Sequence, residues 1–153
     1  MRGISHVAIG VRDMEKSLPF YRDVLGLRVV KDEVERMGGM RGVTDNKRRA
    51  ARLVWDNGLW ATYVVLSQSA GTASGTPSKI DQIGIHHFAF WVDRLRDRFE
   101  RLKGCGARVV LPPTEVSGDS YGGGEGDKVL TCIFEDPDGT LLQFDQQVPA
   151  KSG

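Results

Sequence analysis

The fold is decided by the stretch Ile85-His86-His87-Phe88-Ala89-Phe90-Trp91-Val92-Asp93. Its aromatic and β-branched residues predict a strand with histidine near the start. The same pattern occurs earlier in the chain, as Ile4-Ser5-His6-Val7-Ala8-Ile9-Gly10-Val11. A shift of 81 positions places His6 on His87. Two matching strands with histidine in one register indicate two halves built on one plan.

The repeat continues beyond these two strands. The same shift places Gly58 on Gly139, and each glycine follows Asn or Asp in a hairpin signal. We therefore predict an α+β fold of two βαβββ modules, whose curved sheets pair around a cleft in the manner of a barrel. The predicted single domain covers residues 1–150. Its parts are module one at 3–68, a Ser/Thr/Gly-rich linker at 69–81 and module two at 82–147.

The expected elements follow from periodicity, caps and turn residues. Asp13 or Ser17 caps the first helix, which runs to about Leu25, and Asp93 caps the second, which runs to about Lys103. Glycine-rich stretches at 37–49 and 112–127 are expected to be loops. The predicted strands are 4–11, 28–36, 51–55, 59–67, 84–92, 107–111, 128–135 and 140–146.

The composition is that of an ordinary globular protein, with 40% hydrophobic and 27% charged residues. A net charge of +1 argues against nucleic-acid or anionic-membrane partners. No apolar run approaches the roughly 20 residues of a membrane span, and no signal-peptide core is present. We therefore expect a cytoplasmic protein. Of the two cysteines, Cys132 is expected to be buried and Cys105 to be a packing residue at a helix end.

Four motifs make the chain resemble the vicinal oxygen chelate superfamily, which includes glyoxalase I, methylmalonyl-CoA epimerase, extradiol dioxygenases and bleomycin resistance proteins. The motifs are ISHVA at 4–8, FYRDVLGL at 20–27, IHHFAF at 85–90 and DPDGTLLQ at 136–143. They cover both halves of the chain. The resemblance implies the paired βαβββ fold, a small-molecule ligand and a homodimer.

The resemblance also implies a divalent metal site. Its ligands would be His6, Thr62 or a neighbour, His87 and Gln143, of which the second and fourth are usually carboxylates in the family. No Asp or Glu lies between Leu59 and Gln68. Neutral ligands leave the charge of the ion uncompensated, although two imidazoles still suit Zn, Ni, Co or Fe. Asp145, on the same strand face as Gln143, is a substitute carboxylate, whereas His86 is expected to face the side opposite His87.

Two functions remain open from the sequence. The first is a small-molecule enzyme with divalent-metal-assisted lyase, isomerase or oxygenase chemistry. The second is a metal-free binding protein that sequesters an antibiotic or another planar ligand, as in the bleomycin-resistance branch. The candidate residues are Gln143, Asp145 and Tyr121 for catalysis, Trp60, Thr62 and Trp91 for substrate binding, and His6, His87 and Gln143 for the metal.

Overall fold

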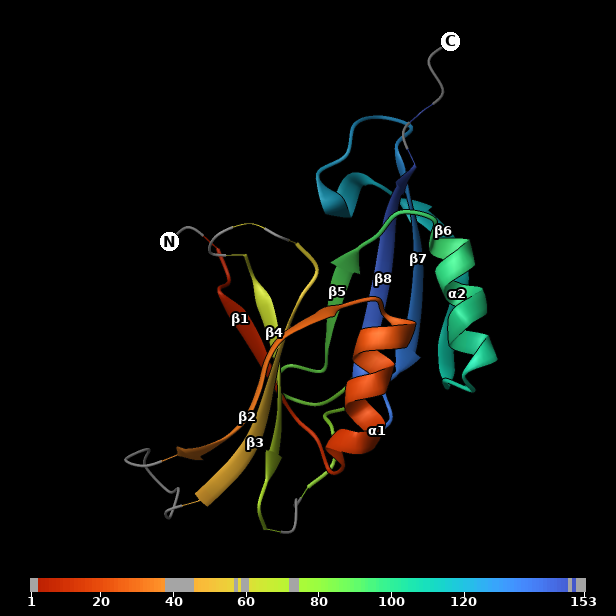
Figure 1. Ribbon diagram of the computed structural model, residues 1–153. Coiled ribbons are helices and arrows are strands. Elements are labelled where there is room, and N and C mark those ends of the chain that lie inside the picture. The colour runs from red at the N-terminus through yellow and green to blue at the C-terminus, as the bar shows by residue number, and fades with distance from the viewer. Residues whose placement is uncertain are drawn as a thin grey trace. The chain divides into compact units, whose positions relative to one another are not determined.

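In the computed structural model, two compact units divide the chain at Gly75, inside the predicted linker (Figure 1). The structure describes residues 3–37, 46–56, 58, 61–71, 75–148 and 150. The first unit is Met1–Gly75 and the second is Thr76–Gly153. No helix of the described part is long and apolar enough to cross a membrane.

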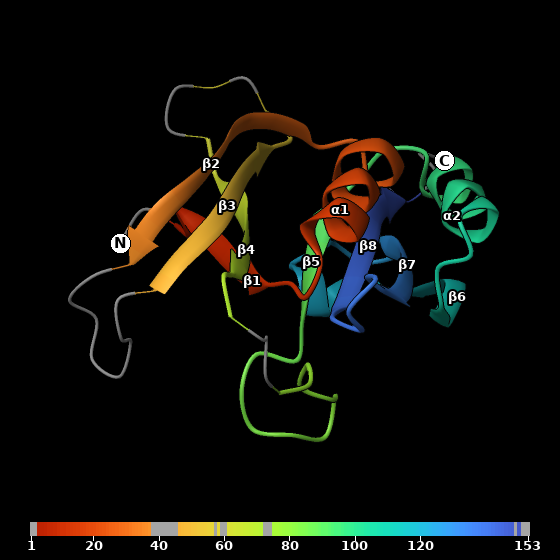
Figure 2. The same ribbon diagram turned by 60° about the horizontal axis from the view of Figure 1, so that its bottom comes forward.

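The two units repeat one topology, and the predicted βαβββ plan is confirmed. The first contains β1 (His6–Gly10), α1 (Met14–Pro19), the π-helix η1 (Phe20–Val24), β2 (Arg28–Met37), β3 (Asn46–Val54) and β4 (Tyr63–Ser69). The second contains β5 (His87–Trp91), α2 (Leu95–Gly104), β6 (Val109–Ser117), the 3₁₀-helix η2 (Asp119–Tyr121), β7 (Lys128–Glu135) and β8 (Leu141–Val148). The sheet orders are β1-β4-β3-β2 and β5-β8-β7-β6, and in each sheet the first pair is parallel. Each sheet is open rather than closed into a barrel, with its four strands in a row (Figure 2).

One face of each sheet forms a hydrophobic core with its helix. In the first unit Leu66 and Leu53 lie on this face with Met14 and Tyr21 from the helical segment, and all four are fully buried. In the second unit the rings of Phe134 and Phe144 lie 4.8 Å apart on the corresponding face. Burying a side chain of this size contributes about 1.5–3 kcal/mol. The strand residues that alternate with the core point to the other face, and the candidate site residues are among these.

A glutamine from the last strand of each unit binds the start of its helix. Gln68 Oε1 accepts a hydrogen bond from Met14 N at 2.7 Å, and Gln146 Oε1 accepts one from Leu95 N, also at 2.7 Å. Of the two caps predicted for the first helix, Asp13 is the one used, and it accepts a hydrogen bond from Glu15 N. In both units a side chain distant in sequence satisfies a backbone donor that the helix leaves unpaired.

The cap predicted for the second helix is wrong. Arg94, not Asp93, is the residue before α2, and it has left-handed backbone angles with no side-chain cap. The Asp93 carbonyl instead accepts a hydrogen bond from the Arg98 side chain. Gln146 satisfies the Leu95 amide, so the helix does not depend on a carboxylate from Asp93.

Pro19 changes the first helix from its predicted form. With Ser17 as the cap, Pro19 would lie in the first turn, but Asp13 is the cap and Pro19 is the last residue of α1. Proline has no N–H and its ring disturbs the preceding turn, so the regular α-helical ladder cannot continue through it. The next turn is a π-helix in which Leu25 N donates to Phe20 O at 3.1 Å. Gly26 then ends the helical segment with φ of 82°.

The two predicted loops are shorter than expected where the structure describes them. Residues 46–49 belong to β3, and 38–45 lie outside the described residues. In the second unit β6 continues through Pro112 and Pro113 to Ser117. This is possible because β6 is an edge strand with register shifts between Val109 and Thr114. The remaining loop is held by hydrogen bonds, including Gly118 N to Asp127 O at 2.9 Å.

Candidate functional site

His6 in the first unit lies on the face opposite the core. It is exposed, it stacks on Tyr63 with ring centroids 5.0 Å apart, and its Nδ1 lies 3.0 Å from Ser5 Oγ. Thr62 donates its hydroxyl proton to the Ile4 carbonyl at 2.8 Å. That bond joins the residues preceding β1 and β4 and leaves the lone pairs of the hydroxyl oxygen free to accept. Trp60, the third candidate of this unit, lies outside the described residues.

The same face of the first sheet carries charged residues that the sequence reasoning missed. His6 pairs with Tyr63, and Tyr63 pairs with Val54, so these three side chains share one face of the sheet. Arg52 and Arg48 lie on the same face, because every second residue of β3 points to the same side as Val54. Arg48 Nε donates to Glu35 Oε1 at 2.7 Å, and Arg52 Nη2 donates to Glu35 Oε2 at 3.2 Å. The hydrogen bond from Arg48 is the main reason why the pKa of Glu35 is lowered. Residues 46–49 are expected from the sequence to form a loop, so the sequence does not predict that Arg48 lies on this face of a strand.

The second unit brings three candidate residues together. Gln143 and Asp145 share a face of β8, as predicted, and are only 8% and 3% exposed. Gln143 Nε2 donates to both carboxylate oxygens of Asp145, at 2.9 and 3.1 Å, and lies 3.3 Å from the Tyr121 hydroxyl. In the described part of the chain no lysine or arginine forms an ion pair with Asp145. A buried negative charge is therefore stabilised chiefly by an amide.

Tyr121 and Thr131 complete this polar group. Burial is the main cause of the raised pKa of Tyr121, and the charge of Asp145 adds to it. The phenol is therefore protonated at neutral pH and can donate a hydrogen bond. Thr131 pairs with Asp145 across β7 and β8, and its Oγ1 is buried without a hydrogen bond of ordinary geometry in the described structure. The Tyr121 hydroxyl is close enough to Thr131 to affect the tyrosine pKa.

His87 lies at the start of β5, and its ring contacts His86. The two Nδ1 atoms are 2.6 Å apart and the ring centroids 4.6 Å apart. The prediction that His86 faces away is wrong because β5 begins at His87, so strand alternation does not extend to its neighbour. Burial chiefly lowers the pKa of His87, His86 lowers it further, and Asp145 opposes them. The neutral imidazole is thus favoured.

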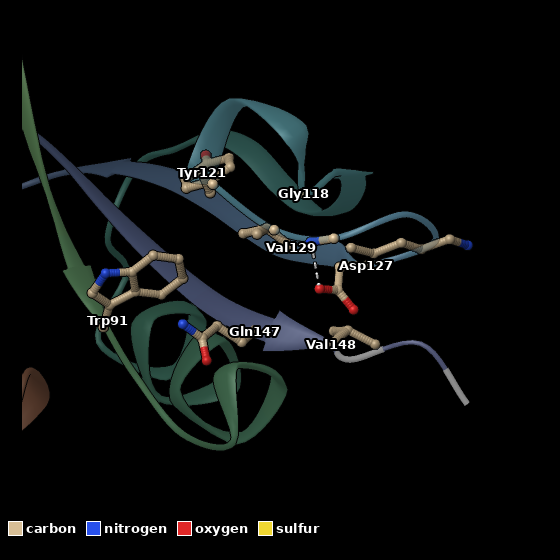
Figure 3. Close-up of a pocket in the computed structure, with 11 residues that line it drawn as sticks. Trp91, Gly118, Tyr121, Asp127, Val129, Gln147 and Val148 are labelled. Carbon is tan, nitrogen blue, oxygen red and sulfur yellow. Dashed lines mark hydrogen bonds between the residues drawn. The ribbon is translucent and has the colours of Figure 1, made fainter. Parts of the chain in front are cut away.

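A pocket of about 260 Å³ lies at the end of the same face (Figure 3). It is lined by Trp91, by Val129 and Gln147, which pair across β7 and β8, and by Tyr121 and the loop that follows. Trp91 and Tyr121 meet edge to face, with ring centroids 5.7 Å apart. Trp91 is paired with Asp145 in the sheet, so the buried carboxylate belongs to the strand beside Trp91, although Asp145 is not one of the lining residues.

The metal donors predicted for the second unit are His87 and Gln143. With His87 Nδ1 facing His86, the ring nitrogen left for a metal is Nε2, and the lowered pKa favours the neutral form that a ligand needs. Because the Gln143 amide nitrogen faces Asp145, its Oε1 is the atom left to coordinate. Within the described residues, no three His, Cys, Asp or Glu side chains gather to hold an ion. These donors fit part of a metal site, with Asp145 orienting one of them.

Comparisons with known proteins agree along the whole chain. The profile of the Glyoxalase/Bleomycin resistance protein/Dioxygenase superfamily matches residues 3–144. A lactoylglutathione lyase of Haemophilus influenzae is 27% identical over 157 aligned positions, which cover 98% of this chain and 96% of that protein. An ethylmalonyl-CoA/methylmalonyl-CoA epimerase of Cereibacter sphaeroides is 30% identical over 146 positions, which cover 94% and 96% of the two chains.

Solved structures show the same fold at low identity. A glyoxalase family protein from Bacillus cereus has a TM-score of 0.75 at 16% identity, with 97% of this chain and 95% of that chain covered. A glyoxylase/bleomycin resistance protein/dioxygenase domain from Frankia sp. has a TM-score of 0.67 at 23% identity, with coverage of 97% and 99%. The chain therefore belongs to the Glyoxalase/Bleomycin resistance protein/Dioxygenase superfamily.

Proposed function

We propose that this protein is a small-molecule enzyme that performs lyase, isomerase or oxygenase chemistry with the help of a divalent metal ion. The observation that carries the proposal is the buried group of Gln143, Asp145 and Tyr121 on the His87 face of the second sheet. Burying a polar side chain away from water costs free energy unless hydrogen bonds compensate for the lost hydration. Tyr121 also lines the nearby pocket, where a ligand can reach it.

Each member of this group has a role in the proposed reaction. Asp145 holds the Gln143 amide so that its carbonyl oxygen is available to the site. Tyr121 donates a hydrogen bond from its neutral phenol to an oxygen of the substrate. Asp145 is the group that accepts a proton, because the family's usual carboxylates are replaced here by Thr62 and Gln143.

The proposed metal ligands are His87 Nε2 and Gln143 Oε1, with His6 included on the resemblance alone. A bound divalent ion would act as a Lewis acid toward a substrate oxygen. With three neutral ligands, the ion should bind more weakly than in relatives with carboxylates, and Zn, Ni, Co or Fe are the candidates.

A second candidate function is a metal-free binding protein. It is favoured by the missing fourth-strand carboxylate and by the exposed edge-to-face pair of Trp91 and Tyr121 in the pocket. Such a protein would hold its ligand on the aromatic rings without reaction. In both cases we propose a homodimer in the cytoplasm, acting on a small molecule.

Metal analysis and activity assays together test the proposal. Untagged protein should carry close to one Zn, Ni, Co or Fe per chain, and the His6→Ala/His87→Ala variant should lose it. The lactoylglutathione lyase and methylmalonyl-CoA epimerase reactions, suggested by the relatives, should be assayed first, then catechol ring opening. Asp145→Asn should reduce turnover by at least about 100-fold if Asp145 accepts the proton. Metal-free protein that is inactive but binds an aromatic ligand would support the second function instead.

A further inference from the structure

The aromatic end of the pocket in the second unit has two ring surfaces open to a ligand. Trp91 is 55% exposed and Tyr121 is 39% exposed, although both line the pocket. Figure 3 shows Trp91 and Tyr121 toward one end of the pocket and Asp127 and Val148 toward the other. Large aromatic side chains are usually covered more fully, so these two surfaces are available for a ligand.

The charge around the pocket is negative. Asp145 does not line the pocket itself, but it is the sheet partner of Trp91 on the neighbouring strand, and it accepts a hydrogen bond from the Gln143 amide. Asp127 lines the pocket, and its carboxylate accepts hydrogen bonds from two backbone amides rather than from a cation. Lys128 is the one cation among the lining residues of the described chain, and Glu115 pairs with it at 3.1 Å.

A second feature on this face of the sheet is a buried hydroxyl. Thr131 Oγ1 has no hydrogen bond of ordinary geometry in the described structure, and Thr131 is the cross-strand partner of Asp145. On β7, Thr131 is the next residue after Val129 that points to the same face, and Val129 lines the pocket. A hydroxyl and a carboxylate thus lie side by side on neighbouring strands of this face.

We propose that this pocket binds an organic ammonium group, which lies against Trp91 and Tyr121 and is attracted by Asp145. Aromatic faces attract cations through the ring quadrupole, and a nearby buried carboxylate strengthens this because little water screens it. An anionic ligand would be repelled by the same carboxylate. The volume of about 260 Å³ suits a small alkylammonium rather than a large planar ring system. This inference rests on the proposed function, for which it names the substrate class.

The test uses choline and its uncharged isostere 3,3-dimethylbutan-1-ol with the full chain, after removal of metal by EDTA. Binding is followed from the indole N–H signals in NMR spectra at 0.15 M salt. Choline should bind at least about tenfold more tightly than the alcohol, since a cation–π contact and a carboxylate together exceed the 1.4 kcal/mol that tenfold represents. Asp145→Asn should remove most of this preference, whereas Asp119→Asn, a matched change outside the lining, should leave it intact.

A tryptophan pair provides a control for folding. Trp91→Leu should weaken choline binding about tenfold, whereas Trp55→Leu should not, although Trp55 is similarly exposed at 51% in the first unit. Equal affinities for choline and the alcohol, or equal effects of the two tryptophan changes, would overturn the proposal. Because these measurements need no metal and no turnover, choline binding without detectable activity would contradict only the enzymatic function.

Discussion

Replacing Gln143 by glutamate would restore the carboxylate that metal-using relatives carry, but it should destabilise this protein. Gln143 Nε2 lies 2.9 and 3.1 Å from the two oxygens of Asp145. Gln143→Glu puts an anionic oxygen in place of that donor. Two unit charges about 3 Å apart repel by about 5 kcal/mol at an effective dielectric constant of about 20.

Protonation limits this cost. The pair can take up one proton, and at pH 7 protonating a carboxyl with an ordinary pKa of about 4.3 costs about 3.7 kcal/mol. We therefore expect the free energy of unfolding to fall by about 3–4 kcal/mol in metal-free protein. The compensating variant Gln143→Glu/Asp145→Asn keeps the net charge and exchanges donor and acceptor. Its stability should return to within about 1 kcal/mol of the parent.

Urea denaturation in EDTA, followed by circular dichroism and tryptophan fluorescence, measures these differences. In a separate series with zinc and no EDTA, the midpoint of Gln143→Glu should rise more than that of the parent, because the new carboxylate is a charged ligand. If the single variant unfolds at the parent's urea concentration, the amide does not neutralise Asp145 as argued. A compensating variant no more stable than the single one would be equally damaging to the reasoning.

Three further outcomes are expected from other contacts. Gly118→Ala should lower the free energy of unfolding by about 1–3 kcal/mol, because its new Cβ would lie 3.0 Å from the Asp127 carbonyl oxygen; an unchanged urea midpoint would contradict this contact. Gln146→Leu should cost about 1–2 kcal/mol by leaving a helix amide unpaired, and hydrogen exchange should quicken first in α2. Burial raises the pKa of Cys132 to about 11, so at pH 8 it should resist iodoacetamide while the exposed Cys105 reacts. Mass spectrometry of the labelled peptides would show whether that order is reversed.

Much of the fold could be predicted because each half carries its own local signals. The strand patterns around His6 and His87, together with the Asp138-Gly139 turn, led to the βαβββ repeat and to a family resemblance that the comparisons confirm. The shared face of Gln143 and Asp145 also followed, because alternation within one strand is a local property.

The rest depends on contacts that sequence patterns do not contain. Gln146 reaches the start of α2 from a strand far along the chain, so local capping rules pointed to Asp93 instead. Pro112 and Pro113 suggested a loop, since the position of their strand at the sheet edge was not known. His86 turned toward His87 because the strand begins three residues later than the pattern indicated, which leaves His86 outside it.

The two consecutive prolines of β6 have a consequence for self-association. β6 is an outer strand, and Pro112 and Pro113 have no amide proton to offer to a neighbouring chain. An incoming strand would find an interrupted row of donors there, which discourages uncontrolled growth of the sheet into aggregates. The protein can therefore keep a long outer strand beside its glycine-rich loop without making that border a template for fibrils.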